Sequence, residues 1–390
     1  MLLRRTQHAL RGATPSRFRP CARCVWYNSA ASFGHAAPER KVIFSGIQPT
    51  GVPHLGNYLG ALRQWVKLQD EAAPDTTLLY SIVDLHAITV KQDAKQLAQW
   101  RKEMLASLQA VGLRSDRSIL FYQSSVPQHA ELMWILSCNA SMGYLGRMTQ
   151  WKSKLALPDS ASPLDSSPSN KSALKLGLFS YPVLQAADIL LYNTTHVPVG
   201  EDQAQHLEFA RELAISFNHT HAPQAEAPLL VPPTTILSPA KRVMSLSNPA
   251  KKMSKSDADV KSRILISDSK EEIRRKLRSA LTDSIEGITY DRENRPGVSN
   301  LVNLIYYMDE SVGASPEMLA QDMQGLSMKA LKEKAVETVE DRIRDVRERY
   351  EYYMRLPPSE LGELAEGGGQ RAQDIAKGTM KRVRTAMGMA

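Results

Sequence analysis

The chain has 390 residues, of which 43% are hydrophobic and 23% charged, with a formal net charge of +8. This composition excludes wholesale disorder, a collagen-like repeat and a disulfide-stapled mini-protein, and the length allows two or three domains of roughly 100–200 residues each. Residues 1–38 hold six arginines, and without them 43 basic residues face 41 acidic ones, so bulk charge does not indicate nucleic-acid binding.

Residues 1–38 have the composition of a transit peptide. They are rich in Arg, Ser and Ala and contain no acid before Glu39. Arg4 and Arg5 interrupt the apolar start at once, which excludes the apolar run of a secretory signal. We therefore expect import into the mitochondrial matrix and cleavage; the alternative is a tail with incidental arginines. No apolar run is long enough for a membrane span, so no membrane association is expected.

From Lys41 onward, short apolar runs alternate with helical patterns. Strands are predicted at residues 42–44, 78–83, 119–122 and 197–199. Helices are predicted at residues 97–111, 181–190 and 203–217. Strands separated by helices indicate an α/β fold with a doubly wound parallel sheet, that is, a Rossmann-like catalytic domain. Ligands of such sheets bind beyond the carboxyl ends of the strands.

Two changes of composition mark the domain organisation. Residues 157–170 are rich in Ser and Pro and are expected to form a loop insertion, and the prolines of residues 222–239 exclude a continuous helix there. Beyond this point strand signals cease, and Ser269 with Glu272 fits the capping box of a helix start. We expect a catalytic domain over residues 39–256 and an α-helical domain over residues 257–390.

The three cysteines argue against a disulfide framework. Cys21 and Cys24 lie in the expected transit peptide. The sequence has no second pair of Cys or His residues at the spacing of a zinc site, so no metal site is expected. Cys138 follows an apolar stretch and is expected to be a small buried residue.

The turn after the first strand contains His54, Gly56 and Asn57 and leads into a helix. Free backbone N–H groups at a helix start favour anions, and glycine permits close approach of a ligand. The turn is not a P-loop, because Val52 and Pro53 replace the Lys-Ser/Thr pair. His54 and Asn57 can donate to phosphate oxygens; the alternative is an ordinary turn with a surface histidine.

A second motif, Lys-Lys-Met-Ser-Lys-Ser, occupies residues 251–256. Lysines beside flexible serines form a mobile cationic clamp, although such a segment alone is usually a solvated loop. Together with the turn at residues 54–57, it resembles the HIGH and KMSKS motifs of class I aminoacyl-tRNA synthetases. Five stretches in order resemble the tryptophanyl-tRNA synthetases of mitochondrial type, at residues 46–61, 83–87, 181–188, 199–203 and 252–256.

The resemblance implies a tryptophan–tRNA ligase that forms tryptophanyl-adenylate and pyrophosphate from L-tryptophan and ATP, then charges tRNA(Trp). It implies catalytic roles for His54, Asn57, Lys154, Lys252 and Lys255. It implies ATP contacts at Gln48, Pro49, Thr50, Gly56, Asn57, Gly200, Glu201, Asp202, Val243, Lys252, Met253, Ser254, Lys255 and Ser256. It implies tryptophan contacts at Phe44, Gln48, His86, Tyr181, Asp188, Val197, Val199 and Gln203. The alternatives are a tyrosyl-tRNA synthetase and a non-catalytic RNA-binding protein on the same scaffold.

Asp188 is the expected selector of the side chain. Indole has one polar group, an N–H donor, so its pocket needs one buried acceptor. Asp188 lies among apolar residues of a predicted helix, where an unpaired carboxylate would be costly, and that cost would reject analogues lacking the donor. The alternative is that Asp188 caps the helix or pairs with a nearby base.

Magnesium is expected to accompany ATP, but no acidic cluster identifies a protein site for a metal, and no permanently bound cofactor is expected. The resemblance also implies a homodimer and a helical domain that recognises the anticodon. Candidate RNA contacts are two basic clusters and one aromatic group: Arg274, Arg275, Lys276 and Arg278; Lys377, Lys381, Arg382 and Arg384; and Tyr350, Tyr352 and Tyr353. The alternatives are solvated helix faces for the basic clusters and a core or interface role for the tyrosines.

Overall fold

The computed structural model describes residues 40–155, 174–200, 203–237, 242–255, 257–309, 311, 313 and 315–390. The expected transit peptide at residues 1–38 and the expected insertion at residues 157–170 lie outside these ranges. The described residues belong to one compact unit, Arg40–Ala390. Within that part of the chain, no helix is both long and apolar enough to cross a bilayer.

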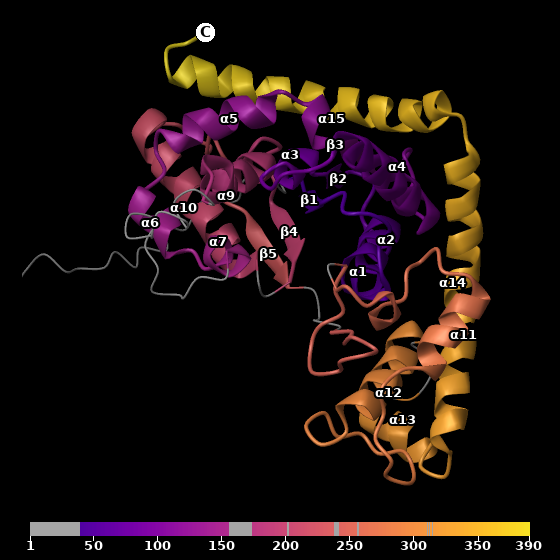
Figure 1. Ribbon diagram of the computed structural model, residues 1–390. Coiled ribbons are helices and arrows are strands. Elements are labelled where there is room, and N and C mark those ends of the chain that lie inside the picture. The colour runs from indigo at the N-terminus through magenta and orange to yellow at the C-terminus, as the bar shows by residue number, and fades with distance from the viewer. Residues whose placement is uncertain are drawn as a thin grey trace, which may run out of the picture. The chain divides into compact units, whose positions relative to one another are not determined.

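One five-stranded sheet forms the centre of the fold, with all neighbouring strands parallel and the order β3-β2-β1-β4-β5 (Figure 1). The strands are β1 Val42–Ile47, β2 Thr77–Ile82, β3 Ile119–Tyr122, β4 His196–Val199 and β5 Thr234–Leu237. Ile43 of β1 lies opposite Leu78 of β2 on one side and His196 of β4 on the other. The doubly wound parallel sheet is therefore confirmed, as are the four predicted strands.

The fifth strand was not predicted. It lies in the proline-rich stretch at residues 222–239 and begins directly after Pro232 and Pro233. The β-branched residues Thr234, Thr235 and Ile236 were the available signal for it.

The helices before β5 are α1 Leu55–Asn57, α2 Arg63–Glu71, α3 Asp84–Ala87, α4 Ala94–Ala110, α5 Gln128–Ser137, α6 Met142–Arg147, α7 Gln150–Lys154, α9 Leu176–Leu190 and α10 Ala204–His221. Those after it are α11 Lys270–Arg278, α12 Pro296–Met308, α13 Pro316–Asp322, α14 Met328–Arg355 and α15 Pro358–Ala386. A π-helical segment, η1 Tyr58–Leu62, joins α1 to α2, and short 3₁₀ segments occur at Gln123–Ser125 (η2) and Val260–Ser262 (η4). The predicted capping box at Ser269 and Glu272 is present at the start of α11.

Alternation along the strands creates two cores, one on each face of the sheet. Ile43 of β1 belongs to the core that includes residues of α2, α4, α12 and α14. Its neighbour Phe44 belongs to the core that includes residues of α5, α9 and α10. Successive side chains of a strand point to opposite faces, so each face of the sheet carries its own helical layer.

Part of the segment at residues 257–390 packs on the sheet. Helix α14 packs on α11, α12 and α4, whereas α15 returns to pack on β3, α5, η2 and α4 (Figure 1). Gly368 of α15 lies directly against the backbone of Leu120 in β3, so the helix covers the edge strand of the sheet. A division of the chain at residue 256 remains a prediction, and the last helix of the expected helical domain packs on the sheet.

Gly368→Ala is expected to lower the free energy of unfolding by about 1–3 kcal/mol, because the added Cβ would overlap the Leu120 carbonyl group. Neither backbone can move away without disturbing the sheet or the helix. Urea unfolding followed by circular dichroism measures the loss. Gly367→Ala is the matched control, since its Cβ would meet no atom within 4 Å, and alanine favours the helix by up to about 1 kcal/mol. Equal stability of the two variants would contradict the close approach.

The expected burial of Cys138 is wrong, because this cysteine is exposed. Helix α5 turns Leu132, Ile135 and Leu136 inward, while Trp134, 72% exposed, lies on the outer side. Cys138 follows Trp134 by four residues and therefore shares its outward face.

Candidate functional site

A cavity of about 420 Å³ opens at the carboxyl ends of β1 and β4. The sheet order reverses between these two strands, and this switch point is where ligands of open α/β sheets bind. Among its lining residues are Phe44, Gly46, Gln48, Gly60, Gln64, Trp65, Val83, His86, Gln150, Lys154, Tyr181, Gln185, Asp188, Val197, Val199, Gly200 and Gln203. Gly60 belongs to the π-helical segment η1, a form of helix that often occurs at functional sites.

All eight residues expected to contact tryptophan line this cavity, together with two of those expected at ATP or in catalysis, Lys154 and Gly200. Three predicted site residues, Glu201, Asp202 and Ser256, lie outside the described residues. The other predicted residues of the two motifs belong to a neighbouring site, built where the turn at residues 48–57 meets the segment at residues 243–255.

His54 and Asn57 form a reciprocal cap at the start of α1. The Asn57 N–H donates to His54 Nδ1 at 3.2 Å, and the His54 N–H donates to Asn57 Oδ1 at 3.3 Å. Burial, followed by the charges of Lys255, Arg263 and Lys252, lowers the pKa of His54 to about 3. The imidazole is therefore neutral near pH 7, and since Nδ1 accepts, the ring proton resides on Nε2. His54 Nε2 is consequently a hydrogen-bond donor.

Gly56 is required by this arrangement. A Cβ at this position would lie 2.8 Å from His54 Cε1 and 2.9 Å from Nδ1, so only glycine leaves room for the buried ring. His54 itself is 5% exposed, which excludes the alternative of a surface histidine in an ordinary turn.

The two motifs meet in space although about 200 residues separate them in the chain. Lys255 Nζ donates to the Gly51 carbonyl at 2.7 Å and to Thr50 Oγ1 at 3.2 Å. The Met253 N–H donates to the Val243 carbonyl at 3.0 Å, and both side chains are buried. Burial lowers the pKa of Lys255 to about 8, with Glu103 opposing the shift. The turn at residues 48–57 and the lysine segment thus form one cationic site.

The remaining residues predicted at this site differ in exposure. Pro49 is buried in the turn between β1 and α1, whereas Lys252 is exposed and Ser254 is half-buried. Lys252 also forms an antiparallel bridge with Met244. Lys252 therefore has a tethered backbone and a side chain that reaches solvent.

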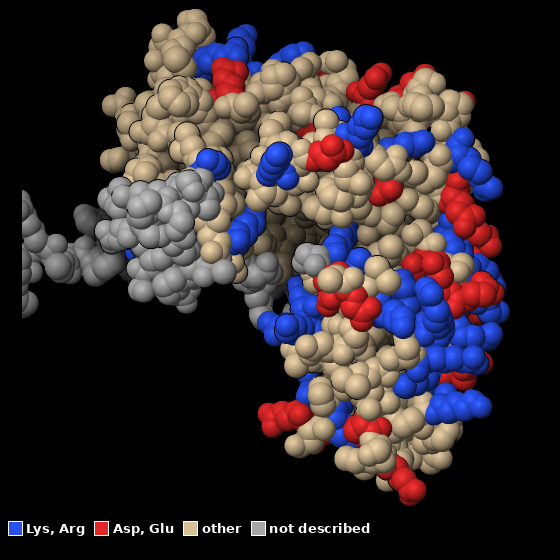
Figure 2. All heavy atoms as spheres, in the orientation of Figure 1, with Lys and Arg blue, Asp and Glu red and all other residues tan. Residues whose placement is uncertain are grey.

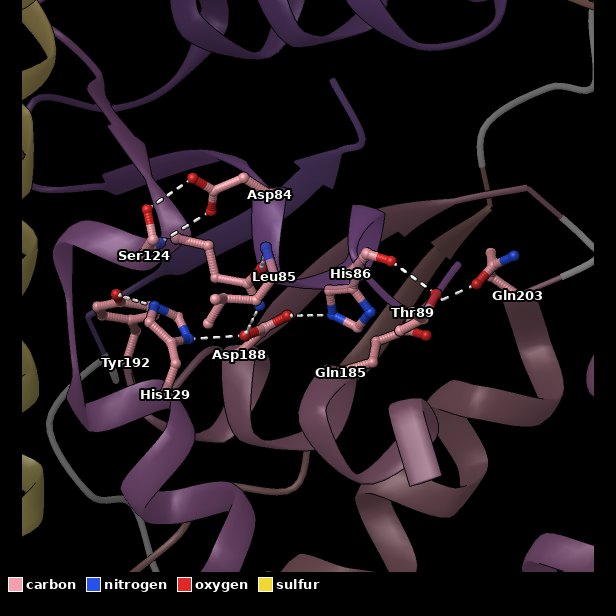
Figure 3. Close-up of polar contacts among 11 residues, drawn as sticks. Asp84, Leu85, His86, Thr89, Ser124, His129, Gln185, Asp188, Tyr192 and Gln203 are labelled. Atoms are coloured by element: carbon pink, nitrogen blue, oxygen red, sulfur yellow. Dashed lines mark hydrogen bonds and ion pairs between the residues drawn. The ribbon is translucent and has the colours of Figure 1, made fainter. Parts of the chain in front are cut away.

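Asp188 is held by three side chains that come from other parts of the chain. Figure 3 shows Asp188 between two histidines: His86 Nε2 lies 2.8 Å from Oδ2, and His129 Nδ1 lies 2.6 Å from Oδ1. Gln123 Nε2 also donates to Oδ1, at 2.7 Å. Burial favours the protonated form, but the adjacent His129 and His86 outweigh it and lower the pKa of Asp188. Asp188 is therefore a buried, ionised acceptor.

The unused acceptor capacity of Asp188 faces the cavity. A carboxylate can accept about four hydrogen bonds; Oδ1 accepts one from Gln123 and lies against His129 Nδ1, and Oδ2 faces His86 Nε2. His86, the partner of Oδ2, lines the cavity with Asp188, whereas Gln123 and His129 are absent from the lining. Oδ2 is thus the oxygen that a ligand in the cavity can reach.

Two polar residues of the cavity, Gln150 and Gln185, were not among the predicted site residues. Tyr181 Oη donates to Gln150 Oε1 at 2.8 Å, and Gln185 Nε2 donates to Gln203 Oε1 at 3.3 Å. Lys154 Nζ lies 4.7 Å from the centre of the Tyr181 ring, and burial lowers the pKa of Lys154. Gln150 and Gln185 thus belong to the polar lining that surrounds Tyr181.

Two of the three partners of Asp188, Gln123 and His129, were also missed, although one of them carried a signal. Gln123 follows β3 directly, so its place at the carboxyl end of a parallel strand could have identified it. His129 gave no comparable signal in its helix.

Of the candidate RNA contacts, two are buried. Lys276 is buried and donates to Asp268 at 2.5 Å, and Tyr350 is buried in the core, so both have structural roles. Arg384 is partly exposed and is held by both oxygens of Glu131 on α5.

Other basic residues reach the surface. Lys and Arg side chains gather over α11 and α14, with acidic ones among them (Figure 2). Arg274, Arg275 and Arg278 line an open depression there, and Glu333 pairs with Arg274 and Arg278. These arginines form a charged surface on the helical segment.

Comparison with known proteins agrees with this geometry. The model of the family "tRNA synthetases class I (W and Y)" matches residues 37–344. A mitochondrial tryptophan–tRNA ligase of Schizosaccharomyces pombe is 45% identical over 357 residues, which cover 90% of this chain and 96% of the relative. That of Saccharomyces cerevisiae is 43% identical, with 90% and 92% covered.

A solved structure of a related protein is also similar to this chain. The tryptophanyl-tRNA synthetase of Campylobacter jejuni, in complex with ADP and tryptophan, superimposes with a TM-score of 0.71 at 31% identity, covering 89% of this chain and 99% of that one.

Proposed function

We propose that this chain, which belongs to the class I tRNA synthetases of the W and Y type, is a tryptophan–tRNA ligase. It would activate L-tryptophan with ATP and then esterify tRNA(Trp). The observation that carries the proposal is a buried, ionised Asp188 that offers Oδ2 to a cavity with apolar walls from Phe44, Val197 and Val199 at the switch point of the sheet. An aminoacyl side chain with one N–H donor fits that acceptor.

Different residues of the cavity would contact the indole ring and the charged groups of tryptophan. Phe44, Val197 and Val199 supply apolar walls around the indole ring, whose N–H donates to Asp188. Gln48, Tyr181 and Gln203 are the polar residues that would hold the ammonium and carboxylate groups. A ring without an N–H would leave Oδ2 without that partner, and such buried polar groups reject analogues strongly.

Activation would occur between the cavity and the cationic site. The tryptophan carboxylate attacks the α-phosphate in line, and pyrophosphate leaves. His54 Nε2–H, Asn57 and the lysines at 252 and 255 would donate to phosphate oxygens as their charge changes, with Lys154 reaching from the cavity side. The Lys255 ammonium has three N–H donors, and its contacts with Thr50 and Gly51 use two of them, so it can also donate to a phosphate oxygen.

Magnesium would enter with ATP. Among the described residues, no group of three His, Cys, Asp or Glu side chains is placed to hold a metal ion. Phosphate oxygens and water would therefore supply most ligands, as is usual for Mg²⁺ bound with a nucleotide.

Location, assembly and RNA binding are further parts of the proposal, and the homodimer rests on the family resemblance alone. We infer a mitochondrial matrix enzyme from the names of the two fungal relatives and from the arginine-rich, acid-free residues 1–38. We also infer a homodimer that contacts tRNA(Trp) through exposed arginines of α11, and such phosphate contacts would weaken as salt rises.

ATP–pyrophosphate exchange tests the activity. With purified protein we expect exchange that depends on tryptophan and is absent with tyrosine or phenylalanine. Exchange with tyrosine would identify a tyrosyl-tRNA synthetase instead, and no exchange with any amino acid would identify a non-catalytic RNA-binding protein.

A further inference from the structure

One carboxylate oxygen of Asp188, Oδ1, is held by two residues that do not line the cavity. Oδ1 receives Gln123 Nε2 at 2.7 Å and lies 2.6 Å from His129 Nδ1. The orientation of the Gln123 amide is dictated by the backbone, because Gln123 Oε1 accepts from the Leu85 N–H at 3.1 Å. Gln123 can therefore present only its amide nitrogen to Asp188.

The His129 side chain is also held in place by its neighbours. Its side chain is completely buried, and its Nε2 lies 2.8 Å from Tyr192 Oη (Figure 3). Burial, with the charge of Asp188 adding to it, raises the pKa of Tyr192, so the hydroxyl keeps its proton and can donate to Nε2. With Nε2 accepting, the ring proton of a neutral His129 lies on Nδ1, next to Asp188 Oδ1. The ring also stacks on Phe121, with centroids 6.1 Å apart.

We propose that His129 is a positioning residue for tryptophan selection, acting through Asp188. With Tyr192 behind it, His129 holds Oδ1 and keeps the carboxylate ionised, so that Oδ2 faces the cavity as an acceptor. The inference rests on the proposed function, since it assigns to Oδ2 the indole N–H. A protonated Asp188 would place an O–H donor in the site or let the carboxyl group turn, and either would repel the indole donor.

Loss of His129 has a predictable sign with pH. The titratable groups that face Asp188 within the described residues are His86 from α3, His129 from α5 and Tyr192 after α9. Removing His129 leaves burial opposed mainly by His86, so the pKa of Asp188 rises. The ionised form is lost as pH falls through that pKa, so the acid limb of kcat/KM for tryptophan moves to higher pH.

The test compares His129→Leu with His129→Asn in tryptophan-dependent pyrophosphate exchange. For the leucine variant we expect the KM for tryptophan to rise about tenfold or more, with kcat and the KM for ATP little changed. Its acid limb should move upward by about one pH unit. In His129→Asn the amide nitrogen replaces Nδ1, so this variant should recover most of the tryptophan affinity. Leu132→Ala is the matched control, because it removes a buried side chain from the same helix without touching Asp188.

The outcomes separate this inference from the function on which it rests. Exchange by the wild-type protein with no change of tryptophan KM or pH profile in His129→Leu, beyond that of Leu132→Ala, overturns the inference alone. No exchange by the wild-type protein removes the function and the inference together. If His129→Leu does not fold, Tyr192→Phe decides: it must move the tryptophan KM and the acid limb in the same direction, by a smaller amount, and an unchanged profile refutes the role.

Discussion

Asp188→Asn is expected to raise the KM for tryptophan by about a hundredfold or more and to reduce discrimination against phenylalanine by a similar factor. Gln123 and His129 both face Oδ1, so the asparagine oxygen will stay there and its amide nitrogen will take the place of Oδ2. A donor would then face the indole N–H and His86 Nε2, where the wild type has an acceptor. Phenylalanine has no N–H and loses nothing.

Pyrophosphate exchange at varied tryptophan and phenylalanine measures both effects, and tryptophan binding by calorimetry checks the ground state. The matched control is Asp283→Asn, which weakens a carboxylate pair with Arg295 and does not line the cavity. That control should retain the wild-type KM for tryptophan. An unchanged ratio of kcat/KM for tryptophan over phenylalanine in Asp188→Asn would show that another group selects the indole ring.

Lys255→Ala is expected to slow adenylate formation by more than about tenfold while leaving tryptophan binding nearly intact. The ammonium lies at the turn that carries Thr50 and Gly51, and Lys255 does not line the tryptophan cavity. Single-turnover formation of tryptophanyl-adenylate measures the rate, and calorimetry measures the binding. Lys251→Ala is the control, since this neighbouring lysine is exposed and outside the predicted site.

The pH dependence supplies a second check on Lys255. Its pKa in the protein is about 8, so the charged form is lost as pH rises through that value. We expect kcat/KM for ATP, which reports the free enzyme, to decline above about pH 8 in the wild type, and that decline to be absent from Lys255→Ala. Equal rates in the two proteins, or the same alkaline decline in both, would exclude a direct role for the ammonium.

The two motifs and their order in the chain were readable from sequence because each has a local chemical signature. A Gly-rich turn at a helix start and a lysine-serine segment are short and contiguous. Their contact, through Lys255 and Gly51, agrees with that interpretation. The strand periodicity likewise predicted the parallel sheet and four of its strands, because burial on both faces leaves continuous apolar runs.

The partners and the charge of Asp188 could not be predicted from the sequence. An acid in an apolar helix, together with the family resemblance, indicated a functional carboxylate, but its partners come from α3, η2 and α5, which lie far away in the chain. Nothing local to Asp188 reveals two histidines and an amide. Their convergence decides that the acid is ionised and which oxygen faces the cavity.

Local sequence patterns also did not predict how whole helices and strands pack on one another. The three consecutive glycines at residues 367–369 gave no hint that one of them meets the backbone of Leu120 and the others do not. The residue types and their spacing were therefore sufficient for the fold class, four of the five strands and the two motifs that resemble HIGH and KMSKS. Tertiary structure alone settled how α15 closes the edge of β3 and how Asp188 is charged, because burial and distance between remote segments exist only in the folded chain.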